Sequence, residues 1–246
     1  MARDGDGPGS PFARPAFIAS AAFLVAVLAG GAWLVLGPRP GAPAPAPPAS
    51  APAAPAAGPA PSPAAPATGT DSVCGLPAGD QEPPDSALGP ATVRVGDGLA
   101  VPSVQGVGPG VTGGVSRCFA HSPTGATLAA ANFIVWLSSN QRLDEVTTTL
   151  IAAGADRDRM LAEVRSSWDG STVPAFAVVG YKVEVRGADE VLVTIAASPA
   201  SDRSRAVAWP LVMVWADGDW KVKPPSNGRW GQTAVTGIAG FIPWGS

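Results

Sequence analysis

The stretch SPTGATLAAANFIVWLSS, residues 122–139, decides how this chain folds. Ser122 suits a helix cap, and Pro123 suits the first helical position because its missing N–H needs no partner there. The residues that follow are apolar on nearly every side of a helix, and such a helix has to be buried. We therefore expect a central helix, covered by other elements.

Two further helical patterns follow this stretch. In the first, apolar residues recur at helical spacing and Gly154 marks the stop: Leu143, Val146, Leu150 and Ile151. The second has an apolar stripe formed by Met160, Leu161, Val164 and Trp168. Asp156 and Asp158 suit its first turn, where acidic side chains oppose the positive end of the helix dipole. The sequence predicts three consecutive helices.

After these helices the apolar pattern changes to the period of a strand. GYKVEVRG (180–187) alternates, VLVTIAAS (191–198) follows across a turn at Gly187-Ala188-Asp189, and Asp217-Gly218 joins AVAWPLVMVW (206–215) to DWKV (219–222) as a hairpin. Helices followed by an antiparallel meander predict an α+β fold, with helices packed on a curved sheet. The strand positions expected to face inward are Tyr181, Val183, Val185, Val191, Val193 and Ile195.

The N-terminal region has a different character. From Ala16 to Leu36 the chain carries no charge, and as a helix this stretch would be about 31 Å long, enough to cross the bilayer core. We expect a cytoplasmic tail (1–14) and a transmembrane helix (15–37) that acts as a signal anchor, with the N-terminus inside. A cleaved signal peptide is the alternative, although its apolar region usually has only ~7 to 15 residues.

Residues 38–70 consist mostly of proline and alanine. Such a segment forms no core, and in extended conformations it reaches up to roughly 100 Å. We expect a disordered linker, and a ligand for a proline-recognising domain is the alternative. An irregular arm (71–116) follows, with a short hairpin in ATVRVGDGLAVPSV (91–104), and then the α+β domain (117–246).

The arm contains GPGVTG (108–113), which formally matches the dinucleotide fingerprint G-x-G-x-x-G. That fingerprint needs a strand before it and a helix N-terminus after it, to hold a pyrophosphate. Here a proline lies inside the motif and another glycine follows it. We therefore expect no nucleotide cofactor.

Cys118 lies three residues before His121, the only histidine, and an imidazole can activate a cysteine nucleophile. The chain has one other cysteine, Cys74. Outside the membrane a pair of cysteines persists as a disulfide, so we predict that Cys74 and Cys118 pair. Closing this loop would stabilise the fold by about 4 kcal/mol in the loop-entropy model. With Cys118 in a disulfide, no thiol is left for His121 to activate, and we expect its imidazole to be packed or at the surface.

Other chemistry has little support in the sequence. The net charge is −3 and no cluster of Lys and Arg exists, which argues against a nucleic-acid surface. There is no Gly-x-Ser-x-Gly motif and no pair of histidines for a metal, so we predict no catalytic residue, cofactor or metal site. Asp217 and Asp219 resemble a carboxylate pair but fit the hairpin better. Several tryptophans lie close together in the C-terminal part of the chain. We expect most of them to belong to the core and a few to form an interaction face: Trp209, Trp215, Trp220, Trp230 and Trp244.

Three segments carry a resemblance to a known group of proteins: CGLPAGDQ (74–81), CFAHSPTGATLAAAN (118–132) and WADGDWKVKPP (215–225). They resemble a family of uncharacterised actinobacterial exported proteins that combine one membrane span, an Ala/Pro stalk and a head domain. The resemblance covers residues 71–246 and implies no biochemical activity.

A second resemblance is looser and concerns the order of the elements. Three helices are followed by strands, and the strands end in an Asp-Gly hairpin that carries tryptophans. This order is similar to the cone-shaped nuclear-transport-factor-2-like fold. A membrane span followed by such a cone resembles assembly subunits of type IV secretion and conjugation machines, which are scaffolds. The same cone also hosts isomerases and dehydratases, which need acid and base groups in the pocket. We expect a non-catalytic, membrane-anchored extracytoplasmic module that contacts envelope proteins. An exported small-ligand pocket or a cone-fold enzyme is the alternative.

Overall fold

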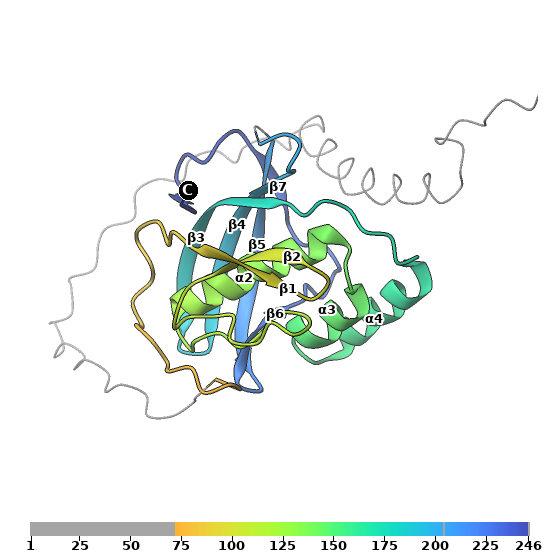
Figure 1. The fold of residues 1–246 in the computed structure, drawn as a ribbon, viewed down its shortest axis with the longest axis horizontal. Coiled ribbons are helices and arrows are strands. Elements are labelled where there is room, and N and C mark those ends of the chain that lie inside the picture. Colours follow the sequence, from red (N-terminus) through yellow and green to blue (C-terminus); the bar gives the residue numbers. More distant parts are fainter. Residues whose placement is uncertain (1–71, 204, 246) are drawn as a thin grey trace, which may run out of the picture. The chain divides into compact units, whose positions relative to one another are not determined.

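A computed structural model describes residues 72–203 and 205–245 (Figure 1). The tail, span and linker expected in residues 1–70 lie outside the described residues. No helix in the described part is long and apolar enough to cross a membrane. The elements are, in chain order, β1 (Ala91–Val95), β2 (Leu99–Ser103), α2 (Pro123–Ser139), α3 (Leu143–Leu150), α4 (Ala155–Ser167), β3 (Ala177–Gly187), β4 (Glu190–Ser198), β5 (Ala206–Ala216), β6 (Asp219–Lys223), β7 (Thr233–Val235) and β8 (Ile242–Pro243).

The main sheet is antiparallel and has the order β6-β5-β4-β3-β8, and β7 also pairs with β5. The predicted hairpin between β5 and β6 is confirmed, with Trp215 opposite Trp220. Asp217 and Gly218 have φ angles of 55° and 73°, the left-handed conformations that a tight turn between twisted strands requires. The Asp-Gly pair therefore sets the register of this edge.

Helix α2 is the central element, as the sequence predicts. The Ser122 hydroxyl accepts a hydrogen bond from the Gly125 N–H at 3.0 Å, so the predicted cap is confirmed. One side of α2 packs on β3 and β4, and the β1–β2 hairpin packs against the helix as well, in front of it in Figure 1. This double cover explains why the helix is apolar nearly all round.

Helices α3 and α4 lie at the β6 end of the sheet (Figure 1). Ile151, directly after α3, forms a parallel bridge with Val222 of β6, and the Ala152 N–H donates to the Val222 carbonyl at 2.9 Å. Helix α4 packs on α3 and contains no fully buried residue. Three helices and an antiparallel sheet confirm the predicted α+β class.

Two of the strand positions expected to face inward, Val183 and Val185, lie on the inward face of the sheet but are less buried than the others. Val185 is 42% exposed and Val183 is only half-buried, although their partners on β4, Val191 and Val193, are buried. The reason is that β8 pairs with β3 only at Gly180 and Tyr181. Beyond that point β3 is an uncovered edge of the sheet.

Candidate functional site

The predicted disulfide between Cys74 and Cys118 is present, with Cα atoms 6.1 Å apart. No free cysteine remains among the described residues. Cys118 is fully buried, whereas Cys74 is exposed. Because its sulfur is bonded, Cys118 offers no thiolate to His121, and the bond instead fastens the start of the arm to the segment before α2.

The glycine-rich segment that resembles a dinucleotide fingerprint packs against this disulfide. A Cβ atom on Gly110 would lie 2.5 Å from the Cys74 Sγ, and one on Gly108 would lie 2.7 Å from the Phe119 ring. The nearest following helix is α2, which begins only at Pro123. These glycines therefore allow close packing, and the segment lacks the helix N-terminus that a pyrophosphate site needs.

Asp219, at the start of β6, is the main polar anchor of this region. Its side chain is 1% exposed and accepts backbone hydrogen bonds from Cys118 at 2.8 Å, Phe119 at 3.0 Å and Trp220 at 2.9 Å. Burial raises the pKa of Asp219, while the N–H donors and Lys221 oppose this shift by stabilising the carboxylate. Asp219 thus does more than shape the hairpin: it holds the backbone of Cys118 beside β6.

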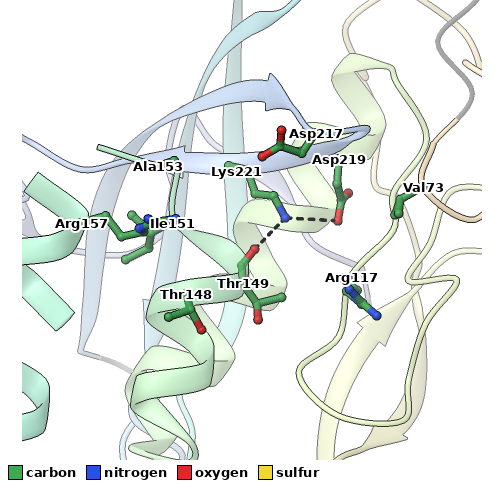
Figure 2. A pocket seen from close by; sticks show the side chains of 10 residues that line it. All are labelled: Val73, Arg117, Thr148, Thr149, Ile151, Ala153, Arg157, Asp217, Asp219 and Lys221. Carbon is green, nitrogen blue, oxygen red and sulfur yellow. Dashed lines mark hydrogen bonds and ion pairs between the residues drawn. The ribbon is translucent and has the colours of Figure 1, made fainter. Parts of the chain in front are cut away.

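A cavity of about 250 Å³ opens beside Asp219 (Figure 2). Its walls come from the arm, from α3 and the loop after it, from α4 and from the β5–β6 hairpin. The lining residues with charges or hydroxyls are Arg117, Thr148, Thr149, Arg157, Asp217, Asp219 and Lys221. The remaining lining residues are apolar: Val73, Ile151 and Ala153.

Lys221 lies between the two acidic residues and α3 in this cavity (Figure 2). Its side chain is 14% exposed, and its Nζ is 3.9 Å from Asp219 Oδ2. The ammonium donates a hydrogen bond to the Thr149 carbonyl at 2.6 Å. Burial lowers the pKa of Lys221, and the charges of Asp219 and Asp217 oppose that shift. The cavity therefore contains a cation that has lost part of its hydration.

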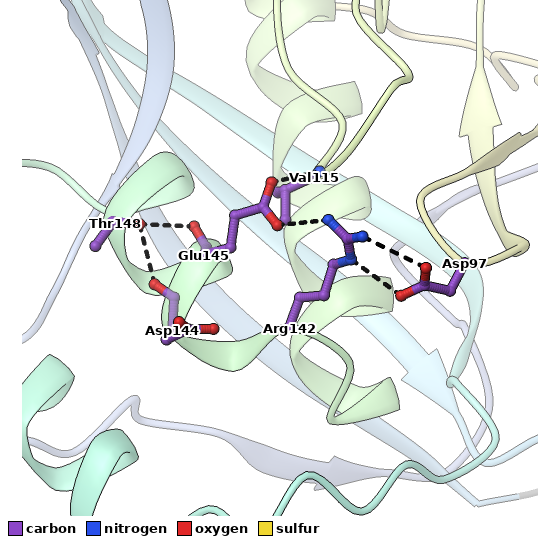
Figure 3. A network of polar contacts seen from close by, with 6 residues as sticks. All are labelled: Asp97, Val115, Arg142, Asp144, Glu145 and Thr148. Atoms are coloured by element: carbon purple, nitrogen blue, oxygen red, sulfur yellow. Dashed lines mark hydrogen bonds and ion pairs between the residues drawn. The ribbon is translucent and has the colours of Figure 1, made fainter.

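A second hollow of about 190 Å³ shares two of its lining residues, Arg117 and Thr149, with the first. Beside it, Glu145 Oε1 accepts the Val115 N–H at 3.1 Å. Arg142 bridges Glu145, at 2.7 Å, to Asp97 in the β1–β2 turn, at 3.0 Å (Figure 3). This network fastens the hairpin and the 111–117 loop to α3, and so it fixes one wall of both hollows.

Comparison with protein families gives one match, to a family described as a domain of unknown function, DUF8175, over residues 40–243. The chain belongs to this family. The match includes both cysteines and every residue that lines the two hollows. No curated protein and no solved structure matches the chain.

His121, the other residue of the suspected cysteine–histidine pair, is packed in a different arrangement. Its ring stacks on Trp215 with centroids 4.1 Å apart. Its Nε2 lies 2.9 Å from Asp189 Oδ1 and 3.1 Å from the Ala188 carbonyl. His121 therefore joins the segment before α2 to the β3–β4 turn, as the expectation of a packed imidazole requires. No group of metal-binding side chains occurs among the described residues.

The five C-terminal tryptophans do not share one exposed surface. Trp220 and Trp244 are buried, and the Trp220 indole donates to the Ala120 carbonyl at 2.9 Å. Trp209, Trp215 and Trp230 are half-buried and pack against the core. Of the five, these three are the more exposed.

Sequence reasoning missed the cavity residues Arg117, Thr149, Arg157 and Lys221. They come from four segments, and the fold alone brings them together. Lys221 looks like an ordinary polar position in an alternating strand, and Arg117 looks like an ordinary polar residue beside a cysteine. No spacing or motif would have found this site.

Proposed function

We propose that the protein is a single-span, membrane-anchored extracytoplasmic module without catalytic activity, which contacts other proteins of the cell envelope. The uncharged stretch from Ala16 to Leu36 supports the anchor, and the Pro/Ala-rich residues 38–70 support a long reach from the membrane. The disulfide supports an oxidising compartment, because such bonds persist outside the cytoplasm.

The observation that carries the non-catalytic part is the packed space between α2 and the sheet. A cone-fold enzyme keeps a pocket there, with acid and base groups inside. In this protein large buried side chains fill the core, including Phe133 of α2, Tyr181 of β3 and Met213 of β5. A filled interior favours function at the surface.

The finer fold assignment belongs to the same proposal. The order of three helices and then an antiparallel meander favours a cone of the nuclear-transport-factor-2-like type, and with it a scaffold role in a conjugation or type IV-like secretion apparatus. This part rests on fold analogy. Loss of DNA transfer or secretion after deletion of the gene would be expected, and unchanged transfer and secretion would remove this assignment.

The anchor and the side of the membrane can be tested on intact cells. We expect an added protease to cut the folded part of the chain in intact cells, and to do so equally when the cells are opened. A cytoplasmic protein provides the control, since it should be cut only after opening. If the folded part is protected until the cells are opened, the extracytoplasmic placement is wrong.

The interaction role needs a separate measurement. A photo-crosslinking residue placed at Val185, which is 42% exposed on the uncovered edge of β3, should capture a defined envelope protein in living cells. The same residue at Glu163, on the exposed side of α4, gives the matched control. Absence of any envelope partner from crosslinkers spread over the surface would contradict the interaction module.

The alternative function is an exported binding site for a small ligand. The cavity around Lys221 favours it, because a partly desolvated cation at the surface is suited to an anionic group.

A further inference from the structure

The cavity beside Asp219 contains hydrogen-bond donors that the described residues do not use. An ammonium has three N–H donors, and Lys221 makes one hydrogen bond, to the Thr149 carbonyl. Its contact with Asp219, at 3.9 Å, is an ion pair beyond hydrogen-bond distance. Within the described part of the chain, neither the Arg117 guanidinium nor the Thr149 hydroxyl has a hydrogen-bond partner. Because the Lys221 side chain is only 14% exposed, its remaining donors are available to an acceptor ligand in the cavity.

The charges around the cavity select the kind of acceptor. Arg117 and Lys221 are the cations that face the cavity, since Arg157 is ion-paired with Asp158 at 3.1 Å, and Asp217 and Asp219 are acidic. The carboxylate of Asp219 is already occupied by three backbone N–H groups, but its charge remains. A ligand with a single negative charge can accept from both cations, whereas a phosphate dianion would meet about twice the repulsion from the two acids. A carboxylate also matches the planar geometry of a guanidinium.

The apolar part of the lining indicates what the carboxylate is attached to. Val73 is 55% exposed at the rim, and Ile151 and Ala153 line the same cavity. Side chains of this size favour contact with a short aliphatic group. The volume of about 250 Å³ admits the end of a chain and leaves no room for a large ring system.

We propose that this cavity binds a carboxylate carried on a short aliphatic chain, with Arg117 and Lys221 as its cationic donors. The carboxylate comes from the C-terminus of a peptide or from a small free acid. The inference deepens the alternative function, a small-ligand site, and does not depend on the membrane-anchored role, because binding is measured on the purified chain regardless of its place in the cell.

The experiment is calorimetric titration of the full chain, kept in detergent, with defined probes. N-acetyl-trialanine carries the carboxylate and small methyl side chains, and we expect it to bind saturably. Its C-terminal amide should bind at least about tenfold more weakly, since it lacks the charge-assisted hydrogen bonds. Butyrate, a single carboxylate on a short aliphatic chain, distinguishes the source: binding tighter than the peptide's indicates a free acid, weaker binding indicates a peptide terminus, and both results support a carboxylate site.

The matched pair of variants is Arg117→Gln and Arg165→Gln. Both arginines are exposed, but Arg165 lies in the last turn of α4 and does not line the cavity. Arg117→Gln should weaken binding of N-acetyl-trialanine by about tenfold, with an unchanged melting temperature, and Arg165→Gln should bind normally. The proposal is overturned if neither carboxylate binds saturably, if the amide binds as well as the acid, if phosphate binds more tightly, or if both variants lose binding equally.

Discussion

At the scale of single residues, Tyr181 offers a direct measurement, because it is the only tyrosine of the chain. Its hydroxyl donates to the Ser86 carbonyl of the arm at 2.7 Å. Burial, and then the charge of Asp85, raises its pKa from 10.0 to about 12. The neutral form is therefore favoured in the fold, so this stability is complete below pH 10.0 and is lost as the pH rises towards about 12.

Absorbance of the tyrosinate during alkaline titration checks this prediction. The native chain should titrate near pH 12, and the chain unfolded in urea should titrate near 10.0. Tyr181→Phe is the control, since it removes the signal and should cost about 1 kcal/mol through the lost hydrogen bond. A native midpoint equal to that of the unfolded chain would show that the hydroxyl is not buried against the arm.

Asp219 gives a second prediction at this scale. Asp219→Ala leaves three buried backbone N–H groups without their acceptor and Lys221 without its nearest counterion. We expect the free energy of unfolding in urea to fall by about 3 kcal/mol. Asp217→Asn is the control, because Asn tolerates the left-handed φ of 55° in this turn. Equal effects of the two substitutions would refute the anchoring role of Asp219.

At the scale of elements, the glycine-rich segment contains glycines that pack closely against other atoms and glycines that have free space around them. Gly110→Ala would place a Cβ 2.5 Å from the Cys74 Sγ, whereas Gly113→Ala meets nothing within 4 Å. We expect Gly110→Ala to lower the free energy of unfolding by about 1 to 3 kcal/mol, as overpacking does, and Gly113→Ala to leave it nearly unchanged. Urea unfolding measures both. Two equally tolerated substitutions would mean that the segment does not pack on the disulfide.

Sequence periodicity predicted the elements better than it predicted their environment. The Ser122 cap, the helical patterns and the Asp-Gly turn are local, and each is present in the structure, although α3 ends at Leu150, before the predicted stop at Gly154. The exposure of Val185 depends on where β8 stops pairing with β3, a contact between distant segments. The cavity depends entirely on such contacts. The loop at Arg117, helix α3 and strand β6 are distant in the sequence and lie side by side only in the folded chain. Local sequence patterns do not predict which distant segments contact one another.

At the scale of the whole molecule, the disulfide connects stability to the candidate site. Val73 and Arg117 line the cavity, and each directly precedes one of the bonded cysteines, Cys74 and Cys118. The bond therefore holds two walls of the cavity at once. Without it the arm would be held at this end by the hydrogen bonds from the Val73 N–H to the Gly218 carbonyl and from Gln81 Nε2 to the His121 carbonyl, both at 2.8 Å.

Reduction of the full chain should consequently do two things. The free energy of unfolding should fall by up to about 4 kcal/mol, the loop-entropy value for a separation of 44 residues. Affinity for N-acetyl-trialanine should fall even where the chain stays folded, because the walls are released. Thiol titration in denaturant without reductant should find no free thiol, and Cys118→Ser should lower the melting temperature. Two titratable thiols in the native chain would contradict the disulfide, whereas unchanged affinity after complete reduction would show that it does not support the cavity.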